Sequence, residues 1–272
     1  MASKKYRDKT CVYCGRDRAS STGDHVIARE FCPGTARDNL PKVPACVACN
    51  NAKSKLEHYV LAVLPMGSLL PGAAAAITDQ VGPRLAKNEA LRRHLAVGQQ
   101  VRWIRTPDGR WHESVALPFD TTKLSELACY IALGLAWHHW QVQLVPNAPV
   151  RAALFSTGRL QLFEQVVASQ DPRARVAGCF GDGVFAYRGV HDRANTATTW
   201  WQMTFFGGVE HRTRHWRGQT TRSVFVATSD DPTWVAQYAE RRADGLAPIS
   251  RDLMPARSAI QRCGSDVRRS KQ

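Results

Sequence analysis

The chain has 272 residues, a length that allows one large or two modest domains with a real hydrophobic core. Its formal net charge is +14, a balance that favours a polyanionic partner such as nucleic acid. The hydrophobic content of 44% is ordinary for a globular protein, and no apolar run follows the charged N-terminal residues, which argues against a secretory signal.

The longest apolar stretch, residues 61–77, is interrupted by Pro and Gly at four positions. Such breaks predict a linker with buried pieces rather than a membrane span. With neither a signal nor a span in view, we expect a cytoplasmic protein without a membrane partner.

Two Cys-x-x-Cys pairs, Cys11/Cys14 and Cys46/Cys49, lie near the N-terminus with 31 residues between them. Four thiolates in two such pairs suit a closed tetrahedral Zn²⁺ site, which would be structural. The alternative is four buried or oxidised cysteines, but the expected reducing compartment favours metal over disulfides. Cys32 lies between the pairs and is the one further cysteine considered as a ligand.

The residues between and after these pairs predict strand, loop, strand and helix. A short strand is expected at 25–27, opened by Asp24, and a second extended piece at 39–44. From Asn50 onward apolar residues recur at three and four, as in a helix, until Pro65 ends it. Asn50, Lys53 and Glu57 then share one helix face.

In this order the residues resemble the HNH endonuclease family. The family pattern is Cys-x-x-Cys, then Asp-His, then Asn, then Cys-x-x-Cys followed by His or Asn and, three residues later, Lys. The resemblance covers roughly residues 8–64. It implies the ββα-metal fold and metal-dependent hydrolysis of phosphodiester bonds in DNA or, as a further substrate, RNA.

Carried over by position, the resemblance implies four catalytic residues. His25 looks like the general base that deprotonates the attacking water, and Asn39 like the residue that orients it. Asp24 and Asn50 look like the ligands of a catalytic divalent ion, Mg²⁺ or Mn²⁺. Without the resemblance, an Asp-His pair more often faces solvent and has no catalytic role, and the two asparagines could merely cap turns or a helix start.

The resemblance also implies substrate contacts: Lys53 looks like a phosphate contact, and Arg29 like a second substrate-binding residue. Two positions depart from the pattern. Ala28 stands where the family often has Pro, which should affect only loop stiffness. Asn50 stands where His is common, which favours a hard, oxygen-ligated ion.

These residue types suit phosphodiester hydrolysis even without the family resemblance. A histidine is the natural base near neutral pH because its unperturbed pKa is about 6.5. A cation held by a carboxylate and an amide oxygen keeps positions open for phosphate and water.

The remaining chain predicts an α+β domain on an antiparallel sheet. In chain order we expect a basic helix at 83–97, a hairpin at 101–117, a helix at 120–140, a helix at 158–167, strands at 175–180, 184–190, 198–209 and 223–228, and a helix from 231 to about 242.

Several basic or histidine-rich segments could bind a ligand or could be ordinary solvated or packed parts of the fold. The helix at 83–97 and the segment 211–217 could contact phosphates, but a solvated face or loop is an ordinary alternative. His138 and His139 point about 100° apart on a helix and therefore suit packing better than a shared metal.

We therefore predict an α+β protein with a zinc-clamped ββα-metal (HNH) domain at 1–64, a linker at 65–82, an α+β domain at 83–245 and a basic tail at 246–272. The leading functional hypothesis is an HNH-type endonuclease that cuts DNA. The alternatives are a zinc-stabilised nucleic-acid-binding protein without cleavage, and a module that docks some other partner. The sequence leaves the oligomeric state open, with a dimer as one option.

Overall fold

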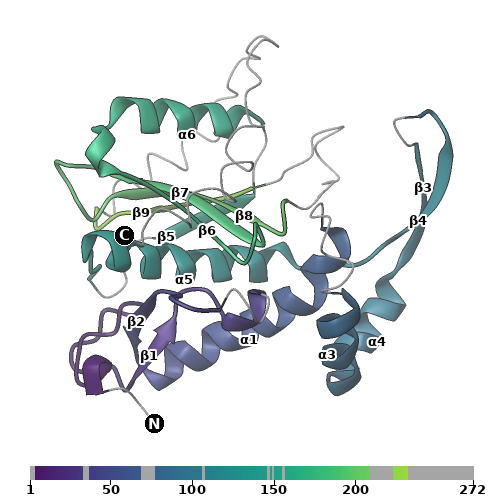
Figure 1. Ribbon diagram of the computed structural model, residues 1–272, viewed down its shortest axis with the longest axis horizontal. Coiled ribbons are helices and arrows are strands. Elements are labelled where there is room, and N and C mark those ends of the chain that lie inside the picture. The colour runs from purple at the N-terminus through teal and green to yellow at the C-terminus, as the bar shows by residue number, and fades with distance from the viewer. Residues whose placement is uncertain are drawn as a thin grey trace, which may run out of the picture.

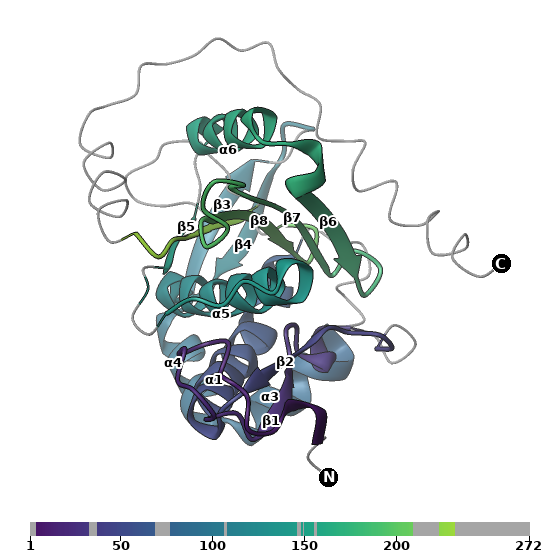
Figure 2. The ribbon, with the colours of Figure 1, turned by 90° about the vertical axis from the view of Figure 1, so that its left-hand side faces the viewer.

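The computed structural model is a mixed α and β protein arranged in layers (Figure 1). Helix α6 (Thr157–Ser169), a five-stranded sheet, helix α5 (Thr121–Trp140) and a segment containing helix α1 (Val47–Val63) follow one another from top to bottom. The perpendicular view in Figure 2 shows the same order. The structure describes residues 4–32, 37–68, 77–105, 108–145, 148, 150–154, 157–208 and 223–231.

The N-terminal segment is a two-stranded ladder followed by α1. Strand β1 (Thr22–His25) pairs antiparallel with β2 (Lys42–Ala45), with Asp24 opposite Val43. Asp24 and His25 therefore close the first strand, whereas the sequence predicted that they open it. The ladder ends there because Val26 and Ile27, both 0% exposed, turn into the core.

Short helical turns complete this segment: η1 (Lys4–Tyr6), η2 (Arg29–Phe31) and η4 (Leu64–Gly67). The α-helical hydrogen bonding of α1 ends at Val63, just before Pro65, as predicted from the proline.

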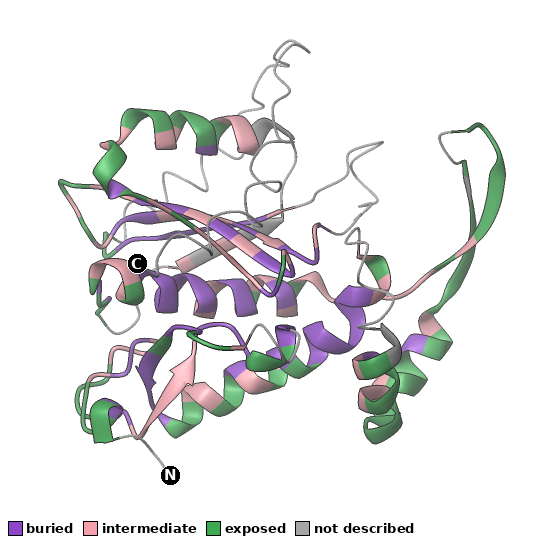
Figure 3. Cartoon of the chain, viewed as in Figure 1, coloured by how far each residue is buried: buried purple, intermediate pink, exposed green. Residues whose placement is uncertain are grey.

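Helix α5 is the centre of the core. Asp120 caps its N-terminus by accepting hydrogen bonds from the backbone of Thr122 and Lys123, as expected for this residue type. Its middle is buried on all sides, because α1 covers one side and the sheet covers the other (Figure 3). Gly134 permits the close approach: a Cβ at this position would lie 2.9 Å from both γ-carbons of Val26.

The large sheet is antiparallel throughout, in the order β5-β9-β8-β7-β6. The sequence predicted every strand except β5. On β8 the neighbours Trp200 and Trp201 face opposite sides: Trp201 is fully buried toward α5, while Trp200 packs with Phe163 of α6. The strands are β5 (Val150–Leu154), β6 (Arg175–Phe180), β7 (Phe185–His191), β8 (Thr199–Phe205) and β9 (Val224–Thr228), with the turn η6 (Pro172–Ala174) before β6.

The predicted helix at 83–97 is two helices. A π-helical turn, η5 (Ile77–Val81), leads into α3 (Gly82–Lys87), and α4 (Glu89–Gly98) follows. Asn88 makes the break, because its side chain accepts a hydrogen bond from the backbone N–H of Leu91 and so starts a new helix.

The predicted hairpin is confirmed as β3 (Gln100–Arg105) paired with β4 (Trp111–Ala116). It projects from the body beside α3 and α4, and its surface is mostly exposed (Figures 1 and 3).

One hydrophobic cluster includes residues of the N-terminal segment, such as Val26 and Val60, together with Trp201 and Val226 of the sheet. Hydrophobic packing is therefore continuous across the domain boundary predicted at residue 64. None of the described helices is long and apolar enough to cross a lipid bilayer. The predicted helix from 231, the segment 211–217 and the tail at 246–272 lie outside the described residues.

Candidate functional site: a four-cysteine cluster beside a buried charge network

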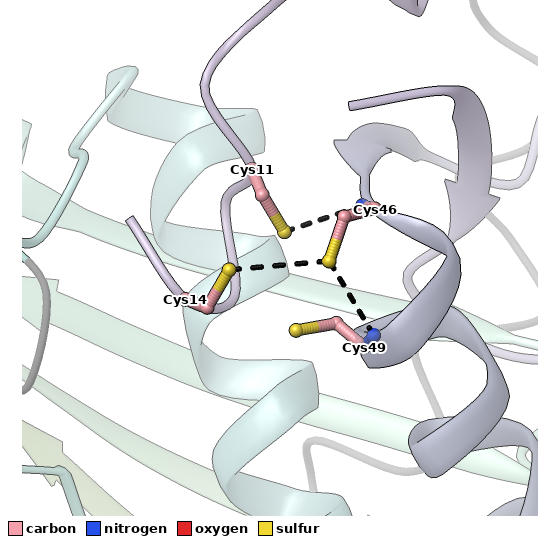
Figure 4. A group of neighbouring side chains, drawn as sticks. All are labelled: Cys11, Cys14, Cys46 and Cys49. Atoms are coloured by element: carbon pink, nitrogen blue, oxygen red, sulfur yellow. Dashed lines mark hydrogen bonds between the residues drawn. The ribbon is translucent and has the colours of Figure 1, made fainter. Parts of the chain in front are cut away.

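Four cysteine sulfurs converge where the N-terminal loop meets the start of α1 (Figure 4). The Sγ atoms of Cys11, Cys14, Cys46 and Cys49 all lie within 4.8 Å of one another. Cys46 is the N-cap of α1, and its sulfur accepts a hydrogen bond from the backbone N–H of Cys49 at 3.5 Å. The second pair thus occupies a helix N-terminus, where unpaired N–H groups favour thiolates.

Arg16 adds positive charge to the cluster. Its guanidinium lies 3.4 Å from the sulfur of Cys14 and 3.7 Å from that of Cys46. Burial alone would raise the pKa of Cys14, but hydrogen bonds, chiefly from Arg16, lower it to about 6. Burial raises the pKa values of Cys11 and Cys49. Burial acts in the same direction on Cys46, but hydrogen bonds with Cys49 and Cys11 lower its pKa.

The cluster fits zinc. Four sulfurs about 2.3 Å from a tetrahedral ion are about 3.8 Å apart, and the sulfurs of Cys14 and Cys46 are 3.9 Å apart. All four positions would be filled by protein, so such a site would be structural. Cys32 is not part of the group: it is buried beside Gly181, and burial raises its pKa to about 11.

A second cluster of polar side chains lies between β1 and α1, around the ammonium of Lys53. The Lys53 side chain is 0% exposed, and its Nζ lies 3.1 Å from Oδ2 of Asp24 and 2.5 Å from Oε1 of Glu57. It also donates to the backbone carbonyl of His25 at 2.7 Å. Tyr13 donates its hydroxyl to the same Asp24 oxygen at 2.6 Å.

This network ties three parts of the fold together. Tyr13 comes from the loop between the first two cysteines, Asp24 from β1, and Lys53 and Glu57 from α1. The Tyr13 ring also packs edge-on against Tyr130 of α5, with ring centroids 5.1 Å apart. Tyr13 thus joins the loop of the first cysteine pair to Asp24 by one hydrogen bond.

The two carboxylates share one ammonium in a mostly dry environment. Burial raises the pKa of Glu57 to about 7, although Lys53 acts in the opposite direction. Burial, together with the charge of Asp24, also raises the pKa of Tyr13 well above its usual value, so its hydroxyl stays a donor. The contacts of Lys53 and Tyr13 with Asp24 both use Oδ2, and within the described residues no hydrogen bond or ion pair to Oδ1 is found.

His25 carries the imidazole predicted as the base. Partial burial and the nearby cations Lys42, Arg29 and Lys53 hold its pKa below the ordinary value, although Asp24 opposes them. The neutral ring, which can accept a proton, is therefore the dominant form at neutral pH.

The other predicted residues lie on the elements that follow β1. Asn50 lies in the first turn of α1, one turn before Lys53 and on the same helix face. Lys53 itself reaches Asp24, but within the described residues no hydrogen bond or ion pair joins the Asn50 side chain to Asp24 or His25. Arg29 is exposed at the start of η2, just after β1.

Asn39 is exposed in the turn before β2, with a φ of 60°. Asparagine is among the residues that tolerate this left-handed conformation, so the turn alone accounts for the residue type. Both Asn39 and His25 are described, and no hydrogen bond joins their side chains.

Two members of the network were not predicted as site residues from the sequence. Glu57 was placed on the face of Asn50 and Lys53, and its spacing of four from Lys53 is the signal that pairs them. Tyr13 carries no such signal, because its partner Asp24 is brought close only by the fold.

Comparison of the chain with protein-family models, with curated proteins and with solved structures gives no match. The assignment of the site therefore rests on its own residues.

Proposed function

We propose that the protein is a metal-dependent nuclease of the HNH type, which hydrolyses phosphodiester bonds in DNA. One observation supports the proposal: Lys53 of α1, three residues after Asn50, is bonded to Asp24 and to the backbone carbonyl of His25 at the end of β1. The proposal takes Asp24 and His25 of β1 and Asn50 of α1 as the carboxylate, the imidazole and the amide of the site. The four-cysteine cluster joins the loop before β1 to the start of α1.

In this proposal His25 takes a proton from the attacking water. Its lowered pKa supplies the neutral form needed for that step near neutral pH. Asn39 would orient the ring only in the substrate-bound state, since no bond joins the two residues here.

Asp24 and Asn50 would hold Mg²⁺ or Mn²⁺, and their oxygen donors suit either ion. A cation bound there supplies Lewis-acid stabilisation of charge on the phosphate and the leaving oxygen. Oδ1 of Asp24 is the atom that fits this role.

Lys53 has a different environment from the one expected of a phosphate contact. Its ammonium is surrounded by protein oxygens, and a phosphate could reach it only by displacing one of them. We propose that Lys53, with Tyr13, holds Asp24 in position, and that the exposed Arg29 is the cation that meets the substrate.

Plasmid cleavage tests the nuclease proposal. The purified protein is incubated with supercoiled DNA in Mg²⁺, in Mn²⁺ and in EDTA, beside the variants His25→Ala and His94→Ala. We expect metal-dependent cutting that His25→Ala abolishes and that His94→Ala, at an exposed histidine on α4, leaves unchanged. Cutting by His25→Ala at the wild-type rate would refute the assigned base.

The contact between Lys53 and Asp24 favours a second candidate, a zinc-stabilised nucleic-acid-binding module without cleavage. A carboxylate already neutralised by an ammonium attracts a divalent ion less strongly. In that case wild type and His25→Ala would bind DNA equally, with an affinity that falls as salt rises, and neither would cut.

A further inference from the structure

The β3–β4 hairpin carries an apolar face that no described element covers. Cross-strand partners and alternate residues share a face, so the register places Trp103, Trp111, Val101 and Val115 together. They are 63%, 63%, 60% and 54% exposed. Neither tryptophan side chain makes an aromatic contact or a hydrogen bond with another described residue.

An arrangement of this kind needs a partner. A two-stranded hairpin with both faces in water is marginally stable, and a patch of exposed Trp and Val marks an interaction site. The hairpin stands away from the body (Figure 1), and the exposure of these four residues shows that its apolar face is open to solvent.

The charges on the hairpin indicate which kind of partner. The apolar face carries one cation and one carboxylate, Arg105 and Glu113, and is neutral as a whole. The opposite face carries Arg102 and His112 without an acidic residue. The chain has a net charge of +14, so a face that binds a polyanion would be expected to carry an excess of cations. A neutral apolar face is better suited to bind a second copy of the chain.

The area is sufficient for a reversible dimer. Covering two tryptophans and two valines to this extent would bury roughly 500 Å² on each copy, or roughly 1,000 Å² in total, at the low end for specific interfaces. Arg105 and Glu113 would give each copy one charge of either sign to present to the other, as a self-complementary interface requires.

We propose that the face formed by Val101, Trp103, Arg105, Trp111, Glu113 and Val115 binds the same face of a second copy of this chain. The hairpin is then a dimerisation arm. Its association does not depend on the nuclease proposal, because it involves none of the residues of that site.

Sedimentation equilibrium of the full chain, freed of nucleic acid, tests the dimer. We expect a monomer–dimer equilibrium with a Kd on the order of micromolar, as a small interface implies. The double variant Trp103→Ser/Trp111→Ser should weaken it at least tenfold, because buried aromatic residues dominate such interfaces. The control Arg102→Ser/His112→Ser, on the opposite face, should leave it unchanged.

A charge exchange distinguishes the loss of an interface contact from unfolding of the hairpin. Arg105→Glu should weaken the dimer by placing two carboxylates on each face, and adding Glu113→Arg should restore it. If the chain stays monomeric up to about 100 µM, well above the expected Kd, the proposal is wrong. A dimer that the tryptophan variant does not weaken would also overturn it. An association that nuclease treatment or high salt abolishes would do the same, because it would show that nucleic acid bridges the two copies. Mass is measured without any cleavage assay, so failure here and failure of the nuclease proposal are separable.

Discussion

The ammonium of Lys53 lies 3.1 Å from Oδ2 of Asp24, and the lysine side chain has no exposed surface. A lysine in this position binds the helix to the strand and fixes the carboxylate with the same contact. Tyr13 bonds the same oxygen, so the second oxygen of Asp24 has a defined direction. The proposed ligand is thus oriented before any metal arrives.

Lys53→Met should destabilise the protein by about 3 to 5 kcal/mol, the cost typical of removing one partner of a buried ion pair. The substitution keeps much of the volume but leaves Asp24 and Glu57 without their cation. Urea unfolding measures the effect. Lys55→Met, at an exposed position on the same helix, is the matched control and should change stability by less than about 0.5 kcal/mol. Equal stabilities for the two variants would show that the network contributes little.

Cys46→Ser should lose the metal and lower the melting temperature, because a site with three thiolates forfeits much of the folding energy that zinc provides. The expected wild-type content is about one zinc per chain, the number that a single four-cysteine site holds. Elemental analysis and thermal melts with and without a chelator measure both effects. Cys32→Ala removes a buried cysteine outside the cluster and should keep its zinc. A folded, zinc-loaded Cys46→Ser protein would exclude the four-thiolate site.

Local signals in the sequence were enough to predict the four-cysteine cluster and most of the secondary structure. Cys-x-x-Cys spacing, the Asp120 cap and the periodicity of α5 each act within a few residues. The contacts of Lys53 were missed for the opposite reason. A lysine three residues after Asn50 can face solvent or protein, and only the packing of β1 on α1 decides between them. The continuous core around α5 likewise depends on contacts between distant segments, such as Val26 with Gly134.

Gly134→Ala should destabilise the protein by about 1 to 3 kcal/mol. In an ordinary helix this change is favourable by up to about 1 kcal/mol, but here the added methyl group would lie 2.9 Å from two carbons of Val26. Gly82→Ala, on α3, adds its methyl group where nothing lies within 4 Å, and it should be neutral or mildly stabilising. Thermal unfolding of the pair separates crowding from helix propensity. A stabilised Gly134→Ala variant would mean that α5 does not approach Val26 so closely.

His139 should make stability depend on pH below neutrality. Its ring extends from the last turn of α5 onto the sheet, and its Nε2 lies 2.8 Å from the hydroxyl of Tyr187. Burial, with a smaller effect of His138, lowers the pKa of His139 from 6.5 to about 4. The unfolded chain therefore takes up this proton at a higher pH than the folded protein does.

Stability linked to His139 is thus fully present above pH 6.5 and is lost as the pH falls from 6.5 to about 4. Because the ring is only partly buried, we expect a loss of about 1 to 2 kcal/mol rather than the full value of the shift. His139→Gln cannot take up this proton, so the difference in unfolding free energy between wild type and variant should shrink across that range. Urea titrations at several pH values give the difference directly, with His94→Gln, at an exposed histidine, as the control. A difference that stays constant from pH 7 to pH 4 would show that His139 is not held neutral by the core.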